Sequence, residues 1–141
     1  MADTTEPETV SLYTILGGES TLRRLVDSFY KKVQGNPLLS SIFPEDIRPV
    51  REKQFLFLTQ LFGGPRSYSD LYGPPMLRAR HLPFPITTER ATAWLECMSD
   101  ALAEIGVEDA MHAFVVDRLT SVAHHMVNTT VELALDLPIT D

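Results

Sequence analysis

At 141 residues, the chain is long enough to bury one hydrophobic core and too short for two domains of usual size. It carries 12 Lys and Arg against 19 Asp and Glu, so a nucleic-acid-binding function is excluded, because a polyanion requires a basic surface. With Cys97 as the single cysteine, an intrachain disulfide and a cysteine-rich zinc site are excluded as well. No signal peptide or membrane-spanning run is readable, and we expect a cytoplasmic protein without a membrane partner.

In the first half of the chain, apolar residues recur at three- and four-residue steps, which predicts helices. The first expected helix covers residues 19–34, between a glycine pair and a Gly-Asn-Pro sequence. A short helical turn is expected at 37–42. The next long helix opens with Asp46 as its cap and Pro49 in its first turn, and it stops at the Gly-Gly-Pro sequence of 63–65.

The second half begins with a proline-rich stretch, 65–85, which we expect to be mostly loop with one short helical turn around 75–81. A long helix then runs from a cap at Thr87 or Thr88 to Gly106. The last helix starts near residues 108–109, and the residues expected to be buried on it are Met111, Phe114, Val115, Leu119, Val122 and Met126. No segment predicts a strand. The fold class is therefore all-α, with one domain over 11–129 and flexible segments at 1–10 and 130–141.

Three polar side chains fall on the inward faces of three different expected helices: Tyr30, Gln54 and Trp94. Each has an ordinary explanation. Gln54 could bond a neighbouring backbone carbonyl, and Tyr and Trp supply apolar area with one polar atom. A buried amide without a partner is costly, however, and three donors aimed at one interior could converge on a small polar ligand. Both interpretations stay open at this point.

His81 ends the short helical turn and is followed by Pro83 and Pro85, which stiffen the chain. It is either a solvent-exposed loop histidine or a metal ligand whose second ring nitrogen bonds a backbone carbonyl. One histidine cannot hold zinc, but it can hold haem iron, because the macrocycle supplies four further ligands. The neighbouring Arg78 and Arg80 suit a small dianionic ligand.

Taken together, these residues resemble the second group of truncated haemoglobins, of the type found in Bacillus. The resemblance covers residues 12–128, and its most specific part is MLRARHLPFPI at 76–86. The other matching pieces are GG (17–18), LVDSFY (25–30), PLL (37–39), FP (43–44), FLTQ (57–60), GGP (63–65), AWL (93–95) and HHMVN (124–128).

The resemblance implies a two-over-two helical sandwich around haem b, with His81 as the proximal iron ligand and Phe43 on the porphyrin face. It places Tyr30, Gln54 and Trp94 on the distal side. The further cofactor contacts that it implies are Val50, Phe57, Tyr68, Tyr72, Met76, Arg78, Arg80 and Phe84, with the arginines near the propionates. One departure is Val50, which stands where this group usually carries a small or hydroxylated residue and which cannot donate a hydrogen bond.

The implied function is reversible binding of dioxygen, held tightly and released slowly by the distal Tyr, Gln and Trp. Nitric oxide, carbon monoxide, peroxide and sulfide are further ligands of the same class. The alternative is a redox enzyme, a nitric oxide dioxygenase or a peroxidase-like protein, which would need an external electron donor because no reductase domain is readable. A haem-free helical interaction module would leave Gln54, Tyr30 and the arginine pair unexplained. We expect a monomer or a weak homodimer.

Overall fold

The computed structural model describes residues 11–129, which form eight helices and no strand, so the predicted all-α class is confirmed for this range. In chain order they are α1 (Leu12–Leu16), α2 (Gly18–Gln34), α3 (Pro37–Ser40), α4 (Arg48–Leu61), α5 (Ser67–Tyr72), α6 (Leu77–His81), α7 (Thr88–Glu104) and α8 (Asp109–Met126).

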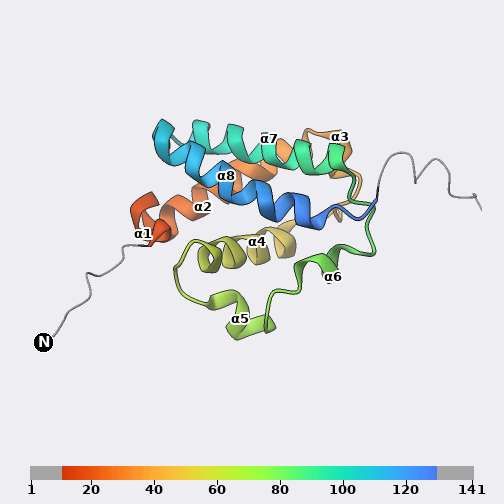
Figure 1. The fold of residues 1–141 in the computed structure, drawn as a ribbon, viewed down its shortest axis with the longest axis horizontal. Coiled ribbons are helices and arrows are strands. Elements are labelled where there is room, and N and C mark those ends of the chain that lie inside the picture. The colour runs from red at the N-terminus through yellow and green to blue at the C-terminus, as the bar shows by residue number, and fades with distance from the viewer. Residues whose placement is uncertain (1–10, 130–141) are drawn as a thin grey trace, which may run out of the picture.

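The four long helices form the core. Figure 1 shows α7 and α8 side by side above α4, with α5 and α6 on the lower side, and α2 packs against both α4 and α7. The apolar stripe predicted for α2 is buried throughout, and Leu22 and Phe29 are fully enclosed. Met98 and Leu102 of α7 and Leu119 of α8 complete the centre. Burial of these faces is the main force that holds the helices together.

The predicted ends of α7 are confirmed. The Thr87 hydroxyl accepts a hydrogen bond from the backbone N–H of Arg90 (3.1 Å), and Gly106 follows the helix with φ of +85°, in the left-handed region that favours glycine. The start of α4 differs slightly, because Ile47 is its N-terminal flanking residue. The Asp46 carboxylate still accepts from the N–H of Arg48 (3.1 Å), so it satisfies one of the free donors of that helix.

Two short helices, α1 and α5, were not expected from the sequence, and tertiary contacts explain both. Tyr13 of α1 donates its N–H to the Phe62 carbonyl (2.8 Å), which fixes α1 against the end of α4. The Gln60 side chain binds α5 through two hydrogen bonds: its Nε2 donates to the Ser69 hydroxyl (2.7 Å), and its Oε1 accepts from the Ser69 N–H (2.9 Å). Helices this short gain their stability from such contacts.

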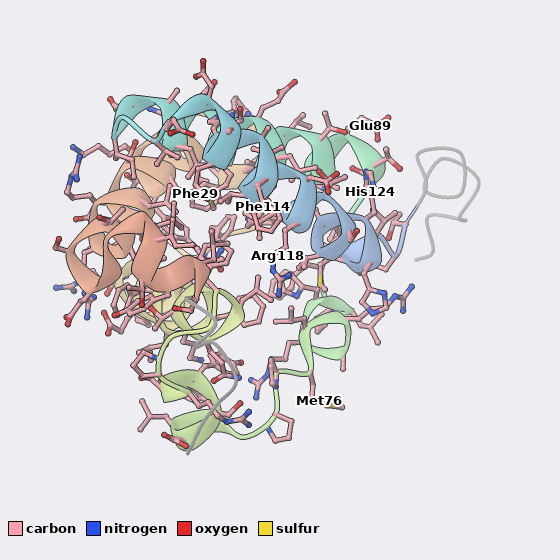
Figure 2. All side chains as sticks on the ribbon, turned by 60° about the vertical axis from the view of Figure 1, so that its left-hand side comes forward. Phe29, Met76, Glu89, Phe114, Arg118 and His124 are labelled. Atoms are coloured by element: carbon pink, nitrogen blue, oxygen red, sulfur yellow. The ribbon has the colours of Figure 1, made fainter. Side chains whose placement is uncertain are left out.

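The prediction that Phe114 is buried is wrong, since its side chain is 55% exposed. The buried face of α8 consists of Val115, Leu119, Ala123 and Met126, and Phe114 stands one residue away from it, about 100° around the helix. Figure 2 labels Phe114 on α8. Within the described range, no helix combines the length and the hydropathy needed to cross a membrane.

Candidate functional site

A cavity of about 230 Å³ opens between the long helices and α6. Its lining is mostly apolar and comes from α2, α3, α4, α6, α7 and α8 together with the loops beside them. The described residues that line it are Tyr30, Leu39, Ile42, Phe43, Val50, Lys53, Gln54, Phe57, Tyr68, Leu77, Arg80, His81, Ile86, Arg90, Ala91, Trp94, Leu119, Val122, Ala123 and Met126. An apolar cavity with a few polar groups is the usual form of a cofactor site.

His81 is the last residue of α6, and its half-buried ring lines the cavity. Its Nδ1 lies 2.7 Å from the carbonyl oxygen of Leu77, one helical turn earlier. Because a carbonyl only accepts, Nδ1 carries a proton, and in the neutral ring the free lone pair is then on Nε2. This tautomer is the one in which a histidine can bind a metal through Nε2.

The three inward polar side chains predicted from the sequence, Tyr30, Gln54 and Trp94, line this same cavity. Tyr30 is 2% exposed, and its ring packs edge-on against Phe29 (4.9 Å between centroids) and Phe43 (5.8 Å). Burial raises the pKa of Tyr30 well above its ordinary value, so its hydroxyl stays protonated and able to donate.

None of these three polar groups is hydrogen-bonded to another described residue. Across residues 11–129, no hydrogen bond is formed by the Tyr30 hydroxyl, the Gln54 amide or the Trp94 indole N–H. The alternative in which Gln54 bonds a neighbouring carbonyl is therefore not observed. Tyr30 is buried and the other two side chains are half-buried, and their unpaired donors are available to a molecule in the cavity.

Of the three cationic side chains that line the cavity, Arg90 donates to backbone carbonyls, and the other two lie next to a pair of tyrosines. Lys53 Nζ lies 5.1 Å from the centroid of the Tyr72 ring, and Arg80 Cζ lies 6.0 Å from that of Tyr68. The two tyrosine rings are themselves 5.2 Å apart. Tyr72 is 40% exposed, so this group of four side chains lies where the cavity meets solvent, and it presents two positive charges there.

The comparisons with known proteins agree with this geometry. The family described as bacterial-like globin matches residues 11–128. The group 2 truncated haemoglobin YjbI of Bacillus subtilis (strain 168) is 54% identical over 113 residues, which are 80% of this chain and 86% of that protein. This chain belongs to the truncated haemoglobins.

Solved structures place it in the second group. The group II truncated haemoglobin of Bacillus anthracis superposes with a TM-score of 0.85 and 48% identity, covering 88% of this chain and 95% of that one. A structure described as a truncated oxygen-avid haemoglobin from Bacillus subtilis gives a TM-score of 0.81 and 51% identity, covering 84% and 100%. The two-over-two sandwich is therefore confirmed, with α2 and α4 as one pair and α7 and α8 as the other.

Truncated haemoglobins carry haem b, and the cavity of this globin fits that group. Its walls are mostly apolar, the His81 ring presents Nε2 without a protein partner, and Lys53 and Arg80 at the solvent edge suit two propionates. Among the described residues, no group of three or more His, Cys, Asp and Glu could hold a bare metal ion. A metal held here by His81 alone would need its further ligands from a macrocycle.

The other predicted cofactor contacts divide into two sets. Phe43, Val50, Phe57 and Tyr68 line the cavity with Arg80, whereas Tyr72, Met76, Arg78 and Phe84 are exposed and outside its lining. Figure 2 shows Met76 pointing away from the helices. The guanidinium of Arg78 instead donates to the Val127 carbonyl (3.3 Å). Contact of these four side chains with the cofactor stays a prediction.

Sequence reasoning missed Lys53, although a signal for it was present. Residues 50, 53, 54 and 57 share one face of α4 at three- and four-residue spacing, so the exposed Lys53 lies beside Gln54 at the edge of the cavity. The apolar wall formed by α8 was missed as well, because Val122 and Met126 were assigned only to the core. Nothing in their spacing separates a side chain that faces a cofactor from one that faces another helix.

Proposed function

We propose that this truncated haemoglobin binds dioxygen reversibly and releases it slowly, with His81 Nε2 as the axial ligand of the haem iron. The bound haem supplies an iron centre with one open position for a diatomic gas. The observation that carries the proposal is the presence of three unpaired donors in a cavity that also holds an imidazole with a free Nε2. The description of a Bacillus subtilis relative as oxygen-avid supports it.

The roles of the chain's own residues follow from their chemistry. The Leu77 carbonyl keeps the His81 ring in the Nδ1–H tautomer and limits its rotation. Tyr30, Gln54 and Trp94 would donate hydrogen bonds to a dioxygen molecule bound in the cavity, each worth about 1–3 kcal/mol. Two such bonds slow release by on the order of a hundredfold, at about 1.4 kcal/mol per tenfold change. Lys53 and Arg80 pair with the haem carboxylates at the edge of the cavity.

The visible absorption spectrum of the purified protein tests this proposal in its ferric, reduced and oxygenated forms, alongside His81→Ala. We expect a Soret band that shifts when oxygen binds and that is altered or lost in the variant. No Soret band after haem is supplied would overturn the haem assignment. An unchanged spectrum in His81→Ala would overturn the axial role of that residue.

A second candidate function uses the same donors to polarise an O–O bond, either in the conversion of nitric oxide to nitrate or in the use of peroxide. The three unpaired donors favour it, because slow oxygen release suits a reaction better than a shuttle. Rapid loss of the oxygenated spectrum on addition of nitric oxide, sustained when an external reductant is supplied, would distinguish this activity. A stable oxygenated spectrum in the presence of nitric oxide would rule out this reaction with nitric oxide and favour oxygen binding as the function.

A further inference from the structure

Asn128, two residues beyond the end of α8, holds the segment that follows His81. Its side-chain Nδ2 donates to the carbonyl of His81 (3.1 Å) and to that of Phe84 (3.0 Å). Its Oδ1 accepts from the N–H of Ile86 (3.0 Å), and its own N–H donates to the Ile86 carbonyl (2.9 Å). One residue therefore bonds this segment at four points.

At its far end the segment is also held by Arg90, which donates to the Pro85 carbonyl (2.7 Å), and by the Thr129 N–H, which donates to the Ile86 carbonyl (3.2 Å). Near His81 it has few other hydrogen bonds. Pro83 and Pro85 have no N–H to donate, and the bond from Phe84 N–H to the His81 carbonyl (2.9 Å) closes only a local turn. Leu82 and Phe84 are exposed, so little burial fixes this stretch. The Asn128 amide has two N–H groups and donates both to this segment. Its oxygen Oδ1 also accepts a hydrogen bond from the Thr129 hydroxyl (2.7 Å).

We propose that Asn128 is a positioning residue for the iron ligand, an inference that rests on the proposed role of His81. The imidazole is held on one side by the Leu77 carbonyl, and the backbone of the same residue is held on the other side by Asn128. The end of α8 thereby sets how far the ring reaches into the cavity and how it is turned. Arg78 adds a further bond from α6 to this end of α8, through the Val127 carbonyl (3.3 Å).

Two substitutions of the amide separate its donor role from its acceptor role. Asn128→Ala removes both. Asn128→Asp keeps an oxygen for the N–H of Ile86 but cannot donate, and it brings a negative charge close to the carbonyls of His81 and Phe84. The matched control is Gln60→Ala, which removes an amide that also bonds one segment twice, but between α4 and α5 rather than behind His81.

The readouts are the iron–histidine stretching band of the reduced protein in resonance Raman spectra and the rate of haem loss to an excess of apomyoglobin. In Asn128→Ala, we expect the band to shift and broaden and haem loss to accelerate about tenfold, the change expected for loss of about one net hydrogen bond. Asn128→Asp should shift both readouts at least as far. Gln60→Ala should leave the position and width of the iron–histidine band as in the parent, and this band is the decisive readout for the control because α5 also carries Tyr68 of the cavity wall.

The proposal is overturned if Asn128→Ala lowers thermal stability as Gln60→Ala does and leaves both readouts unchanged. Should neither Asn128 variant fold, Thr129→Val removes only the hydroxyl that bonds the amide oxygen, and it should shift the band in the same direction by less. A parent protein without an iron–histidine band would overturn the role of His81 and this inference together. A normal parent band with no response in any of these variants would overturn the inference alone.

Discussion

Removing the hydroxyl of Tyr30 tests the distal donors most directly. In Tyr30→Phe, the ring keeps its edge-on contacts with Phe29 and Phe43, so the substitution deletes one polar atom and leaves the packing in place. The hydroxyl makes no hydrogen bond to another described residue, and therefore its loss leaves no buried protein group unpaired. The expected effect is then the loss of one bond to dioxygen, about 1–3 kcal/mol, or roughly a 5- to 150-fold faster release.

Stopped-flow mixing of the oxygenated protein with carbon monoxide measures this release, with Trp94→Phe run in parallel. Tyr13→Phe is the matched control, because it removes a tyrosine hydroxyl from α1, which does not line the cavity. We expect faster release in the first two variants and no change in the third. If Tyr30→Phe and Trp94→Phe both stay within about twofold of the parent, the proposed hydrogen bonding to dioxygen is wrong, since one such bond corresponds to about tenfold.

Five further predictions follow from the same structure. Val50→Ala should change oxygen release less than about threefold in the same assay, because Val50 cannot donate, and a larger change would mean that this position controls the ligand. Release should be constant from about pH 6 to 10, because burial keeps Tyr30 protonated beyond the range where an exposed tyrosine ionises, and an acceleration centred near pH 10 would contradict this. Above about pH 10 the unfolded chain loses this proton and the folded one keeps it, so unfolding by denaturant should become easier as the pH rises further. Lys53→Ala and Arg80→Ala should each speed haem loss to apomyoglobin while leaving oxygen release unchanged. Unchanged haem loss with altered oxygen release would show that these side chains do not pair with the propionates. Leu102→Ala should lower the free energy of unfolding by about 2–5 kcal/mol in urea titrations, since its side chain is fully buried, and a loss below about 1 kcal/mol would show that the core relaxes around the gap.

The long helices were predictable because local and global signals agree in them. In α2, the three- and four-residue spacing of apolar side chains matches the face that is buried, and in α7 the cap at Thr87 and the left-handed Gly106 mark both ends. The short helices lack such agreement. α5 exists where the Gln60 amide meets Ser69, a contact that becomes visible only once α4 is in place. Phe114 shows the opposite error: it was predicted to be buried because it is apolar, but it lies beside the buried face of α8 and is exposed.

The site was predictable to the extent that its chemistry is unusual for a core. Tyr30, Gln54 and Trp94 stood out because polar atoms on buried faces need partners, and all three line one cavity. Lys53 did not stand out, because a lysine on a helix normally reaches solvent along its aliphatic stem. Its place beside Tyr72 depends on α5, the helix that the sequence did not predict. Because α5 was not predicted, the position of Lys53 at the site was not predicted either.

The contacts of His81 show which part of an iron site a sequence can reveal. The proposed ligand was singled out by residue type, by the prolines after it and by the family resemblance of residues 76–86. Its tautomer depends on a carbonyl four residues earlier, which the helical turn of α6 predicts. The amide that holds its backbone lies 47 residues later, at the end of α8, and no local pattern connects the two. The proposed iron ligand can thus be named from the sequence, whereas the groups that hold it become visible only when α6 and α8 are packed together.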